Sequence, residues 1–271
     1  MSQIRVAVFG AGGHMGATVC RAVAEDAELK LTAALDPRLA GIDLSQATGI
    51  TGTGIQVLGS AEALDPSEVD VAVDFTSADA AFANASYCAK VGIHMVIGTT
   101  GLSESQMQQL SAAFAASAAN CVVAANFAIG AVLMMRFAEI AAPLFESIEI
   151  VELHHDNKVD APSGTSLATA ARIAAAREGL PAPKDPTRSE LEGARGHLGV
   201  GGVRIHSLRI KGMVAHQEVI LGTTGQTLSI RHDSYDRSSF MPGVLMAVKS
   251  VGDLSGLSVG LEAIIDARLR G

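Results

Sequence analysis

The chain has 271 residues, a formal net charge of −8 and 48% hydrophobic residues, of which few are aromatic. This length suffices for two modest domains, each with a core built mainly from aliphatic side chains. The acidic balance argues against a nucleic-acid partner, because proteins that bind the phosphate backbone usually carry a basic surface.

The first predicted element is a strand over residues 4–9, which runs directly into a glycine-rich turn and then a helix. Strand, glycine turn and helix open a dinucleotide-binding unit. Glycines at 10, 13 and 16 form the turn, and Met15 stands where the usual G-x-G-x-x-G pattern has its last glycine. The tight turn and a helix N-terminus that can face a pyrophosphate remain possible with this spacing. A plain strand-to-helix turn is the alternative interpretation.

A second strand, predicted over residues 29–35, ends at Asp36. This is about the distance downstream at which an acidic residue binds the ribose 2′-hydroxyl of NADH. Arg38 could instead accept the 2′-phosphate of NADPH. An ordinary strand-end aspartate and a solvated arginine are the alternatives, so the sequence leaves the choice between NADH and NADPH open.

Further strands are predicted over residues 69–75, 93–97 and 121–125, with helices over 76–91 and 103–116 between them. This alternation indicates an α/β fold with a Rossmann-like, doubly wound parallel sheet. Ligands of such sheets lie beyond the carboxyl ends of the strands. We therefore expect the cofactor along a rim made of Gly10, Asp36, Phe75–Thr76, Gly98–Thr100 and Asn126–Phe127. The connection over residues 39–60 is expected to be irregular, with a short strand at 55–58.

The second half of the chain predicts a helix over 130–145, a strand over 147–155, an irregular stretch over 179–202 and a helix over 238–251. Strands at 203–210, 216–221 and 227–232 are joined by short connections and are expected to be antiparallel. We expect a dinucleotide-binding domain over residues 1–126, to which 236–271 returns. A smaller α+β domain over 127–235 would bind substrate and form oligomers through the sheet face that few helices cover.

Residues 152–166 have the composition of an active site, with two imidazoles, an amine and three carboxylates before a Ser-Gly-Thr turn. Ser163 is a good N-cap candidate for the helix that follows, and backbone NH groups at such a helix start can bind a carboxylate. His154 suits proton transfer near neutral pH. Adjacent His154 and His155 would point to opposite faces if the strand continued that far. A structural histidine pair is the alternative, and no metal site is expected, because no third ligand has a recognisable spacing.

The chain is expected to be cytoplasmic. Ser2 leads straight into a predicted strand, which leaves no room for a secretory signal. The most apolar run, residues 121–135, is shorter than the ~20 residues that span a bilayer. The three cysteines form no Cys-x-x-Cys pair, which fits a reducing compartment.

Five motifs, taken together and in order, resemble one family. They are residues 8–16, 73–76, 96–101, 124–127 and, most specifically, Glu152-Leu-His-His-Asp-Asn-Lys-Val-Asp-Ala-Pro-Ser-Gly-Thr165. The chain is similar in these motifs to 4-hydroxy-tetrahydrodipicolinate reductase, also called dihydrodipicolinate reductase, of lysine and diaminopimelate biosynthesis. The resemblance implies reduction of a small dicarboxylate to tetrahydrodipicolinate with NADH or NADPH, in a homotetramer.

The resemblance also implies roles for individual residues. His154 and Lys158 would be catalytic, and His155, Gly164 and Thr165 would bind substrate. The cofactor would be bound by Gly10, Ala11, Gly12, Gly13, His14, Met15, Asp36, Arg38, Gly98, Thr99, Thr100, Ala124, Ala125, Asn126 and Phe127. Ser166 replaces a usual alanine, while His14 and Pro37 stand where relatives often carry arginines that serve the 2′-phosphate.

Two other functions fit parts of the sequence. An amino-acid or semialdehyde dehydrogenase would share the first domain, but the His-His-x-x-Lys motif argues against it. A non-catalytic nucleotide sensor would leave the clustering of His154, Lys158 and Gly164–Thr165 unexplained.

Overall fold

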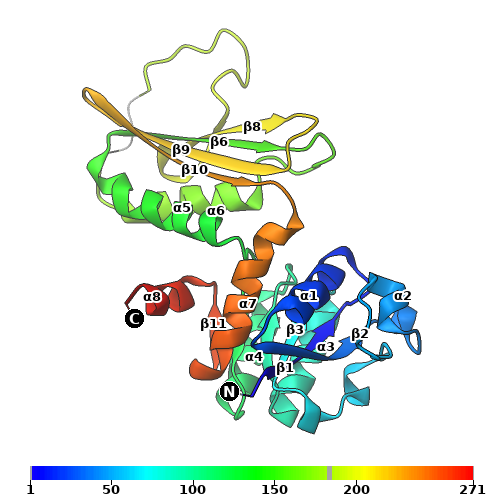
Figure 1. Cartoon of the computed structure of the whole chain (residues 1–271). Coiled ribbons are helices and arrows are strands. Elements are labelled where there is room, and N and C mark those ends of the chain that lie inside the picture. The colour runs from blue at the N-terminus through cyan, green and yellow to red at the C-terminus, as the bar shows by residue number, and fades with distance from the viewer. Residues whose placement is uncertain (1, 182–184, 271) are drawn as a thin grey trace. The chain divides into compact units, whose positions relative to one another are not determined.

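The computed structural model describes residues 2–181 and 185–270. The chain divides into two compact units (Figure 1). The first unit comprises the described residues up to Ile129 together with those from Arg237 onward, and the second unit comprises those of Gly130–Asp236. The roles expected for the two units stay predictions.

The first unit contains a parallel sheet with strands in the order β11-β5-β4-β3-β1-β2. Every neighbouring pair in it runs parallel, which confirms the predicted Rossmann-like sheet. The strands are β1 (Ile4–Phe9), β2 (Leu29–Leu35), β3 (Val71–Asp74), β4 (His94–Ile97), β5 (Cys121–Val123) and β11 (Leu257–Val259). Strand β11 was not predicted. Its three residues make too short an apolar run to signal a strand, and it forms by pairing with β5.

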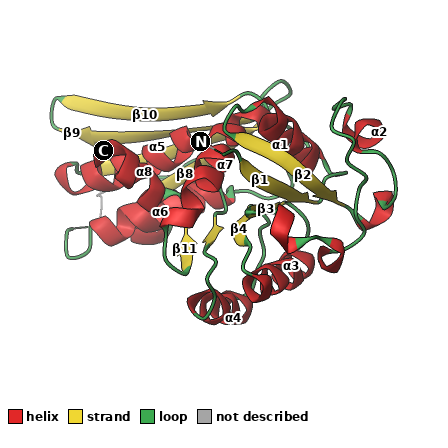
Figure 2. Ribbon diagram, turned by 60° about the horizontal axis from the view of Figure 1, so that its bottom comes forward, coloured by secondary structure: helices red, strands yellow, loops and turns green. Residues whose placement is uncertain are grey.

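Helices cover both faces of this sheet. Figure 2 shows α1 (His14–Glu25) and α7 (Met241–Ser250) on one face and α3 (Ala78–Val91) and α4 (Glu104–Ala115) on the other. The N-cap of helix α4 is Ser103, as predicted, and it makes a reciprocal capping box with Gln106. The C-terminal segment also contains α8 (Glu262–Arg270).

The predicted short strand at residues 55–58 is wrong. Gln56 and Leu58 make only isolated bridges, to Asp43 and Leu35. The connection instead contains a short helix, α2 (Leu44–Thr48), whose N-cap is Asp43. The two bridges connect to different segments, one parallel and one antiparallel, so residues 55–58 form no continuous ladder with either segment.

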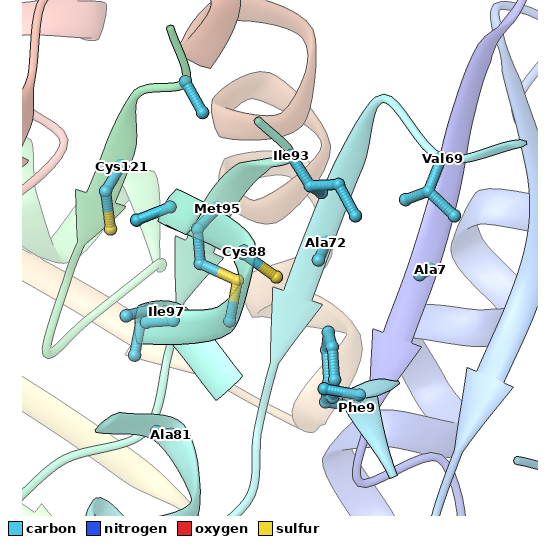
Figure 3. Close-up of a cluster of buried hydrophobic side chains, with 14 of the residues drawn as sticks. Ala7, Phe9, Val69, Ala72, Ala81, Cys88, Ile93, Met95, Ile97 and Cys121 are labelled. Carbon is cyan, nitrogen blue, oxygen red and sulfur yellow. The ribbon is translucent and has the colours of Figure 1, made fainter. Parts of the chain in front are cut away.

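One buried hydrophobic cluster of the first unit lies between the sheet and helices α3 and α4. Figure 3 shows this cluster, with Phe9, Met95 and Ile97 from the strands close to Cys88 and Ala81 from α3. Cys20, Cys88 and Cys121 are all buried and free. Burial raises the pKa of the Cys88 thiol to about 12, so this cysteine packs as a small apolar residue.

The second unit contains a mixed sheet with strands in the order β10-β9-β6-β8-β7. The strands are β6 (Ser147–His154), β7 (His197–Leu198), β8 (Arg204–Arg209), β9 (Ala215–Thr223) and β10 (Gln226–Ser234). The predicted antiparallel pairing is correct for β9 with β10. Strands β8 and β9 also run in opposite directions, as predicted, but they do not pair with each other, because β6 lies between them, parallel to β8 and antiparallel to β9. Residues 182–184 of the predicted irregular stretch lie outside the described residues.

Two helices, α5 (Ile129–Ala141) and α6 (Gly164–Ala176), pack on one face of this second sheet (Figure 1). Ile148 and Ile150 of β6 face them in a buried cluster with Ile173 of α6. No helix among the described residues covers the opposite face, which we call the open face. None of the described helices is long and apolar enough to cross a membrane.

We expect the stability of the first unit to depend on pH through His94. Its Nδ1 accepts the backbone N–H of Asn120 at 2.9 Å. Burial lowers the pKa of His94, against the opposing charge of Asp70. The unfolded chain therefore binds a proton at a higher pH, so the stabilisation is complete above about pH 6.5 and is lost as pH falls towards the folded-state pKa. We expect the urea midpoint to fall between about pH 7 and pH 5.

The control compares two histidines. In His94→Asn the pH dependence of the urea midpoint should be flatter, whereas replacing the exposed His197 in the same way should leave it unchanged. Equal slopes in both variants would contradict the assignment.

Candidate active site

On the helix-covered face of the second sheet, the side chains of β6 change from apolar to polar along the strand. Residues at alternate positions share a face, so Ile148, Ile150, Glu152 and His154 lie in one row. The first two are buried among apolar side chains, whereas the last two place a carboxylate and an imidazole at the carboxyl end of the strand. In the neighbouring strands Ser207 and Gln217 are the register partners of Glu152. The apolar core therefore ends in a polar layer.

Glu152 is completely buried and fully hydrogen-bonded. Arg209 of β8 donates through Nη2 to Oε1 at 3.0 Å and through Nη1 to Oε2 at 3.1 Å. Oε2 also contacts Nδ1 of His154. Burial alone would raise the pKa of Glu152, but the hydrogen bonds from Arg209, Ser207 and His154 outweigh it and hold the pKa below its usual value. The site therefore contains an ionised carboxylate.

His154 is an imidazole suited to proton exchange. Burial lowers its pKa, and the positive charges of Lys158 and Arg209 act in the same direction, while Glu152 opposes them. The ring is therefore neutral near pH 7 and can take up or release a proton there. His155 follows the end of the strand and is exposed, and its carbonyl accepts the N–H of Lys158 at 3.2 Å.

A turn after β6 carries Lys158 and leads to α6. The Lys158 ammonium donates to both oxygens of Asp160, at 2.7 and 2.8 Å. Ser163 is the N-cap, as predicted, and its Oγ accepts the N–H of Ser166 at 3.2 Å. The first NH groups of a helix have no intrahelical acceptor, so those of Gly164 and Thr165 can bind an anion. Ser166, in place of the usual alanine, is buried, and its hydroxyl donates to the Ser163 carbonyl at 2.9 Å.

The first unit provides the predicted glycine turn between β1 and α1. A Cβ added to Gly10, Gly12 or Gly16 would lie 2.0 to 2.5 Å from another atom, so the turn has no room for larger residues. The Gly12 N–H donates to Oδ2 of Asp36 at 3.2 Å. The Asp36 carboxylate is buried at the end of β2, and the Arg38 side chain beside it is 80% exposed. This arrangement fits a dinucleotide that approaches the backbone closely.

Thr99 and Thr100 have different surroundings. The Thr99 hydroxyl is buried, donates to Oδ1 of Asp74 at 2.8 Å and accepts the Thr76 N–H at 2.8 Å. Asp74, which is completely buried, also accepts hydrogen bonds from Thr76 and from Asn84. Thr100 is exposed. The Thr99 side chain therefore holds the ends of β3 and β4 together, and its backbone and Thr100 remain for a ligand.

Replacing Thr99 with valine should lower the free energy of unfolding by about 1–3 kcal/mol, because the buried Asp74 loses a donor and the Thr76 N–H loses one of its two acceptors. Thr100→Val, the matched control, should change it by less than about 0.5 kcal/mol, because this side chain is exposed. Urea denaturation measures both. Equal effects would show that the Asp74 network contributes nothing.

The remaining predicted rim residues follow β5. Ala125 is exposed, and the Asn126 side chain accepts the N–H of Ala128 at 2.9 Å. Ala124 and Phe127 are buried, and the Phe127 ring packs against Phe75 with 5.9 Å between centroids. Ala11 is also buried, His14 is exposed, and Gly13 and Met15 are half-buried. Gly98 lies against the Phe75 ring, since a Cβ there would be 2.1 Å from Cε1. Ala11, Ala124 and Gly98 could therefore contact a cofactor only through their backbone atoms.

Two residues of these sites carried no signal in the sequence. Arg209 lies 57 residues after Glu152, and nothing in its own segment distinguishes it from a surface arginine. Asp74 is one of many strand-end aspartates until the fold places Thr99 beside it. The burial of Glu152 could have been predicted from the sequence, because the alternation of side chains along a strand places it in one row with Ile148 and Ile150.

The chain is similar to known proteins along most of its length. The family model for the N-terminus of dihydrodipicolinate reductase matches residues 4–127, and the model for its C-terminus matches residues 130–265. A 4-hydroxy-tetrahydrodipicolinate reductase of Cutibacterium acnes is 50% identical over 266 residues, covering 97% of this chain and 99% of the relative. That of Mycolicibacterium smegmatis is 47% identical over 264 residues, with the same shares.

A solved structure agrees with these sequence matches. It is a dipicolinate-bound dihydrodipicolinate reductase from Paenisporosarcina sp. TG-14, with 40% identity and a TM-score of 0.87. The match covers 97% of this chain and 99% of that one.

Proposed function

Because the chain belongs to the dihydrodipicolinate reductase family, we propose that it reduces 4-hydroxy-tetrahydrodipicolinate to tetrahydrodipicolinate with a nicotinamide cofactor. The chain is an oxidoreductase, and the reduction is a step of lysine biosynthesis. The observation that carries the proposal is the polar layer at the end of β6, where an imidazole, an ammonium and a helix N-terminus follow one another within residues 154–165.

The proposed chemistry adds one hydride and one proton, after the 4-hydroxyl group has left the substrate as water. A nicotinamide cofactor, when bound, would supply the hydride from C4 to the conjugated alkene-imine system that this loss of water leaves. His154 or Lys158 supplies the proton that quenches the resulting electron density. The charged Lys158 also attracts a substrate carboxylate, and the NH groups of Gly164 and Thr165 bind a carboxylate at the start of α6. His155, exposed beside them, is proposed as a further substrate ligand.

We propose that NADH or NADPH binds at the rim of the first sheet. The glycine turn would receive the pyrophosphate, and Asp36 would accept hydrogen bonds from the adenosine ribose of NADH. The exposed guanidinium of Arg38 would bind the 2′-phosphate of NADPH. His14, Gly98–Thr100 and the residues after β5 would complete this site.

We further propose a cytoplasmic homotetramer. Three buried, free cysteines support a reducing compartment. The open face of the second sheet carries Ile220 and Leu208 among charged side chains and offers a surface for association between copies.

The test follows oxidation of NADH and of NADPH by their absorbance, with substrate made in situ by the synthase of the preceding step. Turnover that needs the synthase product would support the reductase function. Tight cofactor binding without turnover would favour a nucleotide sensor, and oxidation of aspartate or homoserine would favour another dehydrogenase. The ratio of kcat/KM for the two cofactors would show which one Asp36 and Arg38 prefer.

A further inference from the structure

A single guanidinium connects the two side chains proposed to transfer protons. Arg209 is the register partner of His154 in the neighbouring strand and binds both oxygens of Glu152. Its Nη2 also donates to the main-chain carbonyl of Asp160 at 2.6 Å. Asp160 in turn holds the Lys158 ammonium through both carboxylate oxygens. Arg209 therefore contacts the partner of His154 and the partner of Lys158 at once.

The buried carboxylate of Glu152 decides which nitrogen of His154 carries a proton. An ionised carboxylate accepts hydrogen bonds and donates none. Since Glu152 contacts Nδ1 of His154, that nitrogen must carry the hydrogen in the neutral ring. The lone pair then lies on Nε2, which becomes the atom that exchanges a proton with a ligand. A neutral partner at position 152 would allow the opposite tautomer.

The charges around His154 come from three elements. Glu152 faces it from its own strand, Arg209 from β8 and Lys158 from the turn that follows β6. On the other side β9 contributes Ala215 as the register partner of His154 and Gln217 beside Glu152, and neither is charged. Among the residues that the structure describes, Glu152 is thus the only negative group identified in contact with the ring. Its charge stabilises the protonated ring, whereas the positive charges of Lys158 and Arg209 destabilise it.

We propose that Glu152 and Arg209 are positioning residues of the reaction. Glu152 keeps His154 in the Nδ1–H tautomer with Nε2 available, and Arg209 holds both Glu152 and the turn that carries Lys158. The inference rests on the proposed function, because it requires His154 and Lys158 to be the groups that exchange protons with the substrate.

The chain offers a matched control on the opposite face of β6. Glu149 lies three residues before Glu152 and is likewise bound by an arginine, Arg195, and a histidine, His206. The residue types are the same, but this cluster lies on the open face. Glu149→Gln therefore reproduces the loss of a Glu–Arg–His contact without touching the polar layer at His154.

The first experiment compares Glu152→Gln with Glu149→Gln. We expect Glu152→Gln to lower kcat about 10²–10⁴-fold with a smaller change in KM, because the amide can donate to Nδ1 and stabilise the wrong tautomer. The pH limb of kcat that reports His154 should move to lower pH, because the negative charge is removed. Glu149→Gln should leave kcat and the pH profile unchanged, with thermal denaturation showing that both variants fold and gel filtration showing that both keep the wild-type oligomeric state.

The second variant is Arg209→Lys, which keeps the charge but cannot bind two carboxylate oxygens and a carbonyl in one plane. We expect a loss of kcat together with an increase of KM for the dicarboxylate, because both His154 and the Lys158 turn are released. A change confined to thermal stability would mean that the arginine is only structural.

A readout independent of turnover separates this inference from the proposed function. In the wild-type protein labelled with ¹⁵N-histidine, the His154 ring should show a protonated Nδ1 and a pyridine-like Nε2, and Glu152→Gln should reverse or mix the two. The same tautomer in both proteins, or an Nε2–H ring in the wild type, would overturn the inference even if the chain is an active reductase. A protein with the expected tautomer and no turnover would instead contradict the proposed function alone.

Discussion

His154→Ala is expected to lower kcat by about 10²–10⁴-fold while NADH still binds, because a positioned general acid or base contributes that factor. The imidazole lies at the end of β6 with its Nδ1 on the buried Glu152, so no other described side chain in that row can replace it. Steady-state kinetics with substrate made in situ measures kcat, and titration of NADH followed by fluorescence measures cofactor binding separately.

The control for this variant is His197→Ala, at an exposed position in the edge strand β7 of the same sheet. Its kcat should equal that of the wild type. A His154→Ala enzyme that retained more than about a tenth of the wild-type kcat would remove His154 from proton transfer and leave Lys158 as the donor.

Gly16→Ala should weaken cofactor binding and also destabilise the first unit. A Cβ at this position would lie 2.0 Å from the Gly10 carbonyl oxygen, 2.6 Å from the Gly10 carbonyl carbon and 3.0 Å from the Ala11 Cα. All three atoms belong to the backbone, so the turn itself would have to shift and could no longer present its NH groups to a pyrophosphate. We expect a loss of NADH affinity of more than about tenfold and of about 1–3 kcal/mol in unfolding free energy, the usual penalty for overpacking.

Gly13→Ala in the same turn provides the graded comparison, because its Cβ would meet only the Gly10 carbonyl oxygen, at 3.2 Å. Its effects on NADH affinity, measured by calorimetry, and on the urea midpoint should both be clearly smaller. Equal losses in the two variants would mean that any side chain in the turn disturbs the site, and that the close approach at Gly16 has no special role.

Features that depend on neighbouring residues could be read from the sequence. Strands β1 and β2 begin and end where their apolar runs predict, and the caps Ser103 and Ser163 precede their helices as expected. A run of buried residues, a glycine turn or an N-cap involves a few consecutive positions, so its physical cause lies within the pattern itself. The motifs over residues 8–16 and 152–165 identified the family for the same reason.

Features that depend on distant segments were decided only by the tertiary structure. Nothing local shows that β6 separates β8 from β9, or that β11 joins the first sheet beside β5. Arg209 becomes the partner of Glu152 because the parallel register of β6 and β8 sets it opposite His154, and that register is a property of the whole sheet. The sequence therefore determined the side chains that we propose as the reacting groups, whereas the pairing of distant strands decided which side chains contact them.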